Sequence, residues 1–310
     1  MNIAVIGVGG VGGYYGGKLT QLISKQRALN VYFVARNEHL REIQHNGLLL
    51  ETSEGTFVCA PTLATDDISE LPMLDLVLIC VKGYDLDGVV QKLKTRVTEA
   101  TCILPLLNGI DIYDRIKKQL PHVKVLPACV YISMAIEQPG KVVQSGAANM
   151  LHFGEDPQSR GSLWWLSDLF AQATIKFNYT DKPLVEIWSK FVFIASFGLV
   201  TAYFDANFGQ VLSSPDMTTT LRSIMGEIFQ LSKAAGIALP PTVVEESIEK
   251  GRKFAPETRT SFQRDFALPN KKDERELFGG VIVELGKRFN VDVSTAEAVY
   301  SQLNQRKKSL

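Results

Sequence analysis

Residues 1–12 read Met-Asn-Ile-Ala-Val-Ile-Gly-Val-Gly-Gly-Val-Gly, and this stretch decides the fold. Ile3–Ile6 is a short apolar run that predicts a buried strand, and Tyr14–Leu22 can continue as a helix. Between them, three glycines have the G-x-G-x-x-G spacing typical of a dinucleotide-binding loop: Gly7, Gly9 and Gly12. The sequence therefore predicts a cofactor site at the first strand–helix turn.

Each glycine of the pattern has a physical reason to be there. Gly7 permits a tight turn, Gly9 lets a pyrophosphate approach the backbone, and Gly12 lets the helix pack closely on the strand. The helix N-terminus then offers free N–H groups and the positive end of its dipole to phosphate. A flexible turn is the alternative for such a pattern alone, but its place after a strand favours cofactor binding. The loop residues expected to contact the cofactor are Gly7, Val8, Gly9, Gly10, Val11 and Gly12.

The length and composition indicate a two-domain globular chain with no nucleic-acid or membrane partner. The chain has 310 residues, of which 45% are hydrophobic, which is enough for well-filled cores. Lys and Arg together number 33, as do Asp and Glu, so no strongly charged surface is expected. The longest uncharged apolar stretch, Phe191–Phe204, is too short to span a bilayer.

The N-terminus and the cysteines favour a cytoplasmic protein. The first strand begins at Asn2, which leaves no room for a signal peptide. The four cysteines form no C-x-x-C pair, metal-binding spacing is absent, and buried free thiols are the simplest interpretation. The cysteines are Cys59, Cys80, Cys102 and Cys129. The sequence does not fix the oligomeric state and leaves a homodimer open.

Strand and helix signals alternate through the first half of the chain, which predicts a parallel sheet with helices on both faces. The main expected strands are Asn30–Val34, Asp75–Val81, Thr101–Leu107 and Val123–Val130, with helices at Glu38–Asn46 and Leu86–Val97. Shorter strands are expected at Val142–Gln144, Met150–Phe153 and Ile175–Tyr179. Residues 155–162 have a loop composition, and residues 162–173 form a helical pattern.

The pattern becomes helical throughout after Asp181. Asp181 can N-cap a helix with Pro183 in its first turn, and this helix continues toward Ala202. Further helices are expected at Met217–Ala235, Thr242–Phe254, Arg275–Phe289 and Thr295–Arg306. We therefore predict an α/β protein with an N-terminal Rossmann-type dinucleotide-binding domain at residues 1–181 and a C-terminal all-helical substrate domain at residues 182–310. The loop at residues 155–162 is the alternative boundary.

Polar residues follow three expected strands at the ends where ligands of open α/β sheets bind. Arg36 closes the second strand, and its guanidinium suits a 2′-phosphate, which favours NADP over NAD. A surface arginine is the alternative, and Glu38 nearby could still make the site specific for NAD. Lys82 could bind the cofactor or be an ordinary strand-end lysine. Asn108 could bind ribose or nicotinamide, or start a plain Asn-Gly turn.

Lys190 is the only charged residue between Ile187 and Val200. This helix shows no wide polar face and should be largely buried, so a lysine there is costly unless it lines a cavity or has a partner. Glu186, one turn earlier, could be an ordinary helical partner of Lys190. A functional and a purely structural role for Lys190 are therefore equally open. The polar residues from Thr260 to Glu276 could likewise be a loop followed by a charged helix start.

Taken together, these features resemble the ketopantoate reductase family (2-dehydropantoate 2-reductases) over nearly the whole chain. In the first half the resemblance rests on the glycine pattern with Gly16, Arg36, Val81-Lys82, Asn108-Gly109 and the Pro139-Gly140 turn. In the second half it rests on a W-x-K match at residues 188–190, an S-M-x-x-D-like segment at residues 261–265 and a T-E-to-Gly-like segment from Asp273-Glu274 to Gly280.

The resemblance implies NADPH-dependent reduction of a 2-oxo acid to a 2-hydroxy acid, most typically 2-dehydropantoate to pantoate in pantothenate biosynthesis. It implies that Lys190 polarises the carbonyl oxygen and donates a proton, with Glu274 orienting the lysine or the bonds around the substrate. It implies that Ser261 binds the substrate carboxylate, and Asn207 lies near where a further substrate-binding asparagine is expected.

The chain departs from the family pattern where the substrate binds. The family usually has asparagines four and eight residues after the lysine, and here these positions are Ile194 and Gly198. The usual methionine and threonine of the later segments are Phe262 and Asp273. These changes favour a less polar 2-oxo acid, or one held differently. Alternative functions are another two-domain dehydrogenase acting on a 2-oxo or 3-hydroxy acid, and a catalytically idle NADP-binding sensor.

Overall fold

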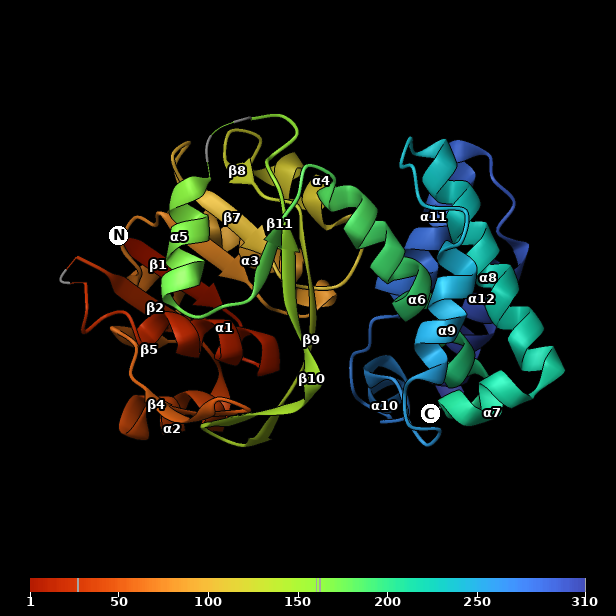
Figure 1. Cartoon of the computed structure of the whole chain (residues 1–310), viewed down its shortest axis with the longest axis horizontal. Coiled ribbons are helices and arrows are strands. Elements are labelled where there is room, and N and C mark those ends of the chain that lie inside the picture. Colours follow the sequence, from red (N-terminus) through yellow and green to blue (C-terminus); the bar gives the residue numbers. More distant parts are fainter. Residues whose placement is uncertain (27, 160, 162, 310) are drawn as a thin grey trace. The chain divides into compact units, whose positions relative to one another are not determined.

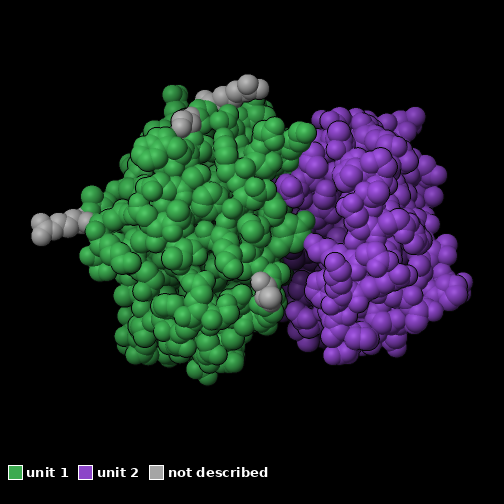
Figure 2. Space-filling model, viewed as in Figure 1, with its two compact units in different colours: residues 1–107, 112–183 green, residues 108–111, 184–310 purple. Residues whose placement is uncertain are grey.

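The computed structural model describes residues 1–26, 28–159, 161 and 163–309, and the chain forms two compact units. Unit 1 contains residues 1–107 and 112–183, and unit 2 contains residues 108–111 and 184–310 (Figure 2). The division therefore follows Pro183, whereas the sequence analysis placed it after Asp181. The short segment Asn108–Asp111 groups with unit 2, although the predicted first domain included it. Arg160 and Ser162 lie outside the described residues, and with them part of the expected loop and the first residue of the helix expected from 162.

The centre of unit 1 is a six-stranded sheet in which every pairing is parallel (Figure 1). The strand order is β5-β2-β1-β6-β7-β8, which is 3-2-1-4-5-6 within this sheet and is the order of Rossmann domains. All four residues of β6 are buried, as expected for a strand covered on both faces. The strands are β1 (Asn2–Ile6), β2 (Asn30–Val34), β5 (Leu63–Thr65), β6 (Leu76–Ile79), β7 (Cys102–Pro105) and β8 (Lys124–Val125). The predicted parallel sheet is confirmed.

Unit 1 also contains a second sheet that the sequence analysis did not recognise as separate. Its order is β11-β10-β3-β4, with β9 paired to β10. Helix α1 packs against strands of both sheets, and glycines allow this close approach. A Cβ on Gly16 would lie 2.7 Å from the Phe33 ring, and one on Gly17 would lie 2.8 Å from Leu50. The strands are β3 (Leu48–Thr52), β4 (Gly55–Cys59), β9 (Ala128–Gln138), β10 (Lys141–Phe153) and β11 (Phe177–Tyr179).

Two strand predictions were wrong in their extent. The expected strand Val123–Val130 is two strands in different sheets, β8 and β9, and Pro127 between them has no N–H to donate to a ladder. The expected short strands at 142–144 and 150–153 are both part of β10. The polar stretch between them stays in the strand, with a register shift against β9 between Gln144 and Asn149.

The remaining helical elements of unit 1 connect the strands. They are α1 (Gly10–Thr20), α2 (Asn37–Asn46), α3 (Leu86–Leu93), α4 (Ile112–Gln119) and α5 (Trp164–Gln172), with 3-10 turns η1 (Ile68–Glu70) and η2 (Gly83–Asp85). Unit 2 is helical throughout the part that the structure describes. Its elements are α6 (Pro183–Phe204, which starts at the end of unit 1), α7 (Phe208–Ser213), α8 (Pro215–Ala234), α9 (Val243–Arg252), α10 (Ser261–Phe266), the π-helical η3 (Glu276–Gly280), α11 (Val281–Phe289) and α12 (Ser294–Ser309).

Helix α6 differs from its prediction in two ways. It begins at Pro183, so Lys182 rather than Asp181 stands directly before it. The whole helix has 22 residues and is long and apolar enough to cross a membrane, judged by length and composition alone. The sequence analysis considered only the shorter stretch 191–204, which is too short to do so. However, 67% of its most apolar window is buried inside the protein, and the core helix of a soluble protein passes the same test. This helix is therefore only a weak indication of a membrane span.

Candidate active site

The glycine loop joins β1 to α1 at the carboxyl edge of the parallel sheet. Gly7 has a φ of +93°, and a Cβ there would lie 2.9 Å from the Val81 backbone nitrogen. A Cβ on Gly12 would lie 2.2 Å from the Gly7 carbonyl oxygen. A Cβ on Gly10 would lie 2.4 Å from the Met134 carbonyl oxygen. Protein contacts therefore require glycine at these three positions.

Gly9 is the loop glycine that faces open space, because a Cβ there would have no atom within 4 Å. It is also the N-cap residue of α1, and no side chain caps this helix end. The first-turn N–H groups of α1 are therefore not held by a capping side chain, and phosphate oxygens can use them. The neighbouring loop residues Val8 and Val11 are buried and half-buried, respectively. This loop fits the pyrophosphate of a dinucleotide.

Arg36 and Lys82 lie at the same sheet edge, on either side of the loop. Strand β1 runs between β2 and β6, and Arg36 follows β2 while Lys82 follows β6. The Arg36 side chain is 71% exposed, and its Nη2 lies 2.8 Å from Oδ2 of Asp85. Lys82 is half-buried and precedes the η2 turn. The sequence analysis missed Asp85, because no motif marks this residue and only the fold brings it to Arg36.

Lys190 of α6 is buried, with 8% of its surface exposed, and its Nζ donates a hydrogen bond of 2.8 Å to Asn108 Oδ1. The two residues are 82 positions apart, and both belong to unit 2. Asn108 was predicted as a cofactor ligand, whereas the structure brings its amide oxygen to the lysine. This contact gives the buried ammonium a polar partner and fixes the position of Nζ.

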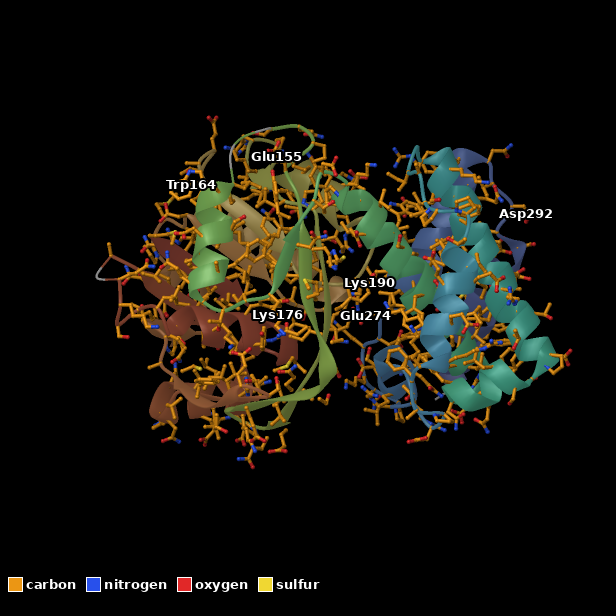
Figure 3. The ribbon with its side chains drawn as sticks, viewed as in Figure 1. Glu155, Trp164, Lys176, Lys190, Glu274 and Asp292 are labelled. Carbon is orange, nitrogen blue, oxygen red and sulfur yellow. The ribbon has the colours of Figure 1, made fainter. Side chains whose placement is uncertain are left out.

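Glu274 is also buried, with 4% of its surface exposed, and it precedes the π-helical turn η3. Its carbonyl oxygen accepts a hydrogen bond from the N–H of Phe278, and the Phe278 ring packs on Phe191, the residue after Lys190. This contact brings the start of η3 to the part of α6 that carries the lysine. Figure 3 labels Lys190 and Glu274, whose labels stand one above the other in this view. Both residues predicted to be catalytic are therefore buried, on segments of unit 2 that pack against each other through Phe191 and Phe278.

Two of the residues that depart from the family pattern, Gly198 and Phe262, lie beside each other in unit 2. A Cβ on Gly198 would lie 3.4 Å from the Phe262 ring and 3.6 Å from the Phe278 ring. These rings also pack together, with centroids 5.6 Å apart. The Cβ of an asparagine at position 198 would therefore be in van der Waals contact with two aromatic rings. Ile194, one turn after Lys190, is half-buried. Gly198 therefore faces the apolar rings of Phe262 and Phe278, and Ile194 adds a second apolar residue on the same helix.

The two predicted substrate residues have different surroundings. Ser261 is exposed at the first position of α10, and the preceding Thr260 caps this helix by accepting a hydrogen bond from the Gln263 N–H. The Asn207 side chain caps α7, where its Oδ1 accepts from the Gln210 N–H at 2.9 Å. Gln210 Oε1 in turn accepts from the Asn207 N–H, also at 2.9 Å. The structure therefore gives Asn207 a role in holding a helix end.

Metal-ligand clusters were not expected from the sequence. Among the described residues there is no group of three or more His, Cys, Asp or Glu side chains that could hold a metal ion. The four cysteines are free thiols. Burial raises the pKa of Cys80, which follows β6, well above its ordinary value, so this thiol stays protonated at neutral pH.

Comparison with known proteins covers both units. A family model described as ketopantoate reductase PanE/ApbA matches residues 3–158, and its C-terminal companion matches residues 184–307. The protein named "Uncharacterized oxidoreductase YkpB" of Bacillus subtilis (strain 168) is 25% identical over 304 residues, which cover 98% of each chain. The crystal structure of 2-dehydropantoate 2-reductase from Porphyromonas gingivalis W83 is 30% identical with a TM-score of 0.84, over 98% of this chain and 99% of that chain.

The same fold occurs in a structure of D-mandelate dehydrogenase with NADH and anilino(oxo)acetate, which is 19% identical over 100% of this chain and 99% of that chain, with a TM-score of 0.86. This likeness concerns the fold alone. The family models, by contrast, match most of both units, and the predicted lysine and glutamate are buried on packed elements of unit 2. The chain therefore belongs to the ketopantoate reductase PanE/ApbA family of dinucleotide-binding oxidoreductases.

Proposed function

We propose that this protein catalyses the NADPH-dependent reduction of a 2-oxo acid to a 2-hydroxy acid. The observation that carries the proposal is the buried Lys190, whose Nζ is fixed by the amide oxygen of Asn108. The reduction of 2-dehydropantoate to pantoate is the reaction named for the relative from Porphyromonas gingivalis. That reaction is the first candidate for this chain.

Residues of unit 1 would hold the cofactor. The backbone N–H groups after Gly9 are suited to the pyrophosphate, and Arg36 is suited to a 2′-phosphate. Arg36 supports NADPH as the cofactor, because a guanidinium forms charge-assisted hydrogen bonds with phosphate. When bound, the reduced nicotinamide supplies the hydride.

The residues of unit 2 supply the acid chemistry. As hydride adds to the carbonyl carbon, the C=O π electrons move to the oxygen, where negative charge develops. The Lys190 ammonium hydrogen-bonds to this oxygen and donates a proton, which completes the hydroxyl group. The lysine is left neutral and regains a proton from water. Asn108 keeps Nζ in place, and Glu274 orients the lysine or the hydrogen bonds around the substrate.

The apolar surroundings of Lys190 support a substrate with an apolar side chain. Ile194 and Gly198 present no hydrogen-bonding side chain, and Phe262 packs beside Gly198. Ser261 is the proposed carboxylate ligand. We also propose a cytoplasmic location, which free cysteines and a mostly buried α6 support.

The test is a screen of 2-oxo acids with purified protein, in which NADPH oxidation is followed by absorbance. We expect turnover of at least one branched 2-oxo acid. The Lys190→Ala variant is the control and should show no NADPH oxidation with the same substrate. Tight NADPH binding without turnover of any 2-oxo acid would favour a cofactor-binding sensor. Turnover of 3-hydroxy acids with NADP⁺ would favour the other dehydrogenase class.

A further inference from the structure

We propose that Asp85 sets the balance between NADPH and NADH by competing with the 2′-phosphate for Arg36, an inference that rests on the proposed cofactor site. The two side chains form an ion pair in which Arg36 Nη2 lies 2.8 Å from Asp85 Oδ2. The guanidinium that would bind the 2′-phosphate thus already has a carboxylate partner within the chain. A cofactor with this phosphate competes with the carboxylate for the guanidinium.

The place of this pair in the sheet makes it relevant to the cofactor. Strand β1 lies between β2 and β6, and all three strands are parallel, so their carboxyl ends share one edge. Arg36 follows β2, and Asp85 ends the η2 turn that follows β6. The ion pair therefore bridges the end of the strand that leads into the glycine loop. Dinucleotides lie across this edge in domains of this strand order, with the ribose near the residues that follow the second strand.

Arg36 and Asp85 differ in how far their side chains can move. The Arg36 side chain is 71% exposed and that of Asp85 is 22% exposed. The turn that carries Asp85 is held from two sides, because the Asp85 N–H donates to the Lys82 carbonyl and Arg115 Nη2 donates to the Gly83 carbonyl. Arg36 can therefore turn toward a ligand, while Asp85 stays beside the place that the guanidinium leaves.

The charges decide how this pair acts on each cofactor. An exposed ion pair is weak, and a phosphate forms stronger charge-assisted bonds with a guanidinium than a single carboxylate does. The 2′-phosphate therefore displaces Asp85 from Arg36. The displaced carboxylate then stands close to a group of the same charge, and this repulsion weakens NADPH binding. NADH carries a hydroxyl at this position and does not meet the repulsion.

The test compares the dissociation constants of NADPH and NADH for the wild-type protein and Asp85→Asn, measured by fluorescence titration. We expect Asp85→Asn to bind NADPH about five- to twentyfold more tightly, as for removal of one nearby like charge close to a protein surface. The affinity for NADH should change less than about twofold, because NADH carries an uncharged hydroxyl where NADPH carries the 2′-phosphate. Titrations with 2′,5′-ADP and 5′-AMP repeat the comparison without the nicotinamide, so the result does not depend on turnover.

Asp87→Asn is the matched control. It removes the same charge two positions later, where the carboxylate is paired with Arg115 at 2.8 Å instead of with Arg36. Unchanged or weaker NADPH binding by Asp85→Asn would overturn the proposal, and weaker binding would show that Asp85 holds Arg36 ready for the phosphate. An equal gain of NADPH affinity in Asp87→Asn would also overturn the proposal, because removal of any nearby negative charge would then have the same effect. A wild-type protein that binds neither cofactor would contradict the proposed function itself, and the inference with it.

Discussion

Lys190 Nζ donates a hydrogen bond of 2.8 Å to Asn108 Oδ1. The bond joins α6 to the short segment that follows β7 in the chain, and both residues belong to unit 2. An ammonium has three N–H donors, and the bond to Asn108 directs one of them at a neutral acceptor. The side chain proposed as the proton donor is therefore held to the segment that follows β7, and the bond to a neutral amide oxygen does not remove its charge.

Lys190→Ala should lower kcat by about 10²- to 10⁴-fold, the usual contribution of a positioned general acid. NADPH affinity should stay nearly unchanged, because the proposed cofactor contacts lie in unit 1. Steady-state kinetics and a fluorescence titration measure the two quantities, and Lys233→Ala on α8 is the control for a lysine elsewhere. A variant that unfolds, or that keeps most of its activity, would show that Lys190 is structural and pairs with Glu186.

Asn108→Asp should move the alkaline limb of the pH profile of kcat/KM to higher pH. The new carboxylate would lie beside the lysine and stabilise its charged form, so the ammonium would persist to higher pH. Asn108→Ala should lower kcat without this displacement. If both variants instead weaken NADPH binding and leave the pH profile unchanged, Asn108 acts on the cofactor, as the sequence analysis predicted.

Arg36→Ala should weaken NADPH binding by about 1.5–3 kcal/mol, the range for hydrogen bonds to a charged group. NADH binding should barely change, because the contact concerns the 2′-phosphate. The comparison needs titrations with both cofactors and Arg41→Ala as control, since Arg41 is exposed on the following helix. Equal losses of affinity for both cofactors would show that Arg36 does not bind the 2′-phosphate.

The parallel sheet and its cofactor loop could be predicted because each rests on local sequence. The apolar run of β1, the glycine spacing and the apolar β6 each decide a structure within a few residues. The second sheet could not be recognised, because the pairing of β3 with β10 joins residues far apart in the chain. The break between β8 and β9 depends on which sheet each strand joins.

The residues of the candidate site could be picked out from the sequence, but the contacts between them could not. Lys190 stood out as a single charge in an apolar helix, and the sequence offered Glu186 as its nearest partner. The hydrogen bond to Asn108 spans 82 positions, and the Arg36–Asp85 pair spans 49 positions. Such pairs depend on the strand order, which periodicity does not reveal. The helix cap formed by Asn207 could have been suspected from Gln210 three positions later.

His39 should make the folded state less stable as the pH falls below about 6.5, the ordinary histidine pKa. Burial lowers the pKa of His39, against a smaller opposing effect from the Val8 backbone, and its Nδ1 accepts a hydrogen bond from the Gly140 N–H. The unfolded chain therefore takes up the proton first, and stability is lost from the ordinary pKa down to the lowered one.

His39→Asn keeps a hydrogen-bond acceptor and should flatten the melting temperature between about pH 7.5 and about pH 5, the range that brackets the ordinary histidine pKa. Thermal unfolding measured across this range tests the expectation. The control is His45→Asn, because His45 is exposed on the same helix α2. A pH dependence that persists in His39→Asn and disappears in His45→Asn would contradict the assignment.

The substrate preference should follow from the apolar residues Ile194, Gly198 and Phe262, which stand where the family usually has polar residues or methionine. A site without polar partners cannot reject an analogue that lacks a hydroxyl, because no buried group is left unpaired. We expect kcat/KM for ketopantoate to exceed that for its deoxy analogue 2-oxo-3,3-dimethylbutanoate by less than about tenfold. A dedicated hydroxyl-binding site can reach about 10⁴-fold or more.

Gly198 and Phe262 allow the same expectation to be tested by mutation. Gly198→Asn alone should destabilise the fold by about 1–3 kcal/mol, because the Cβ already contacts the rings of Phe262 and Phe278 and the amide group needs further space. Gly198→Asn combined with Phe262→Met should relieve this crowding and raise the preference for ketopantoate. Phe262→Met alone is the control, since it makes space but adds no amide. A wild-type protein that already prefers ketopantoate strongly would show that another group, such as the Asn207 amide, recognises the hydroxyl.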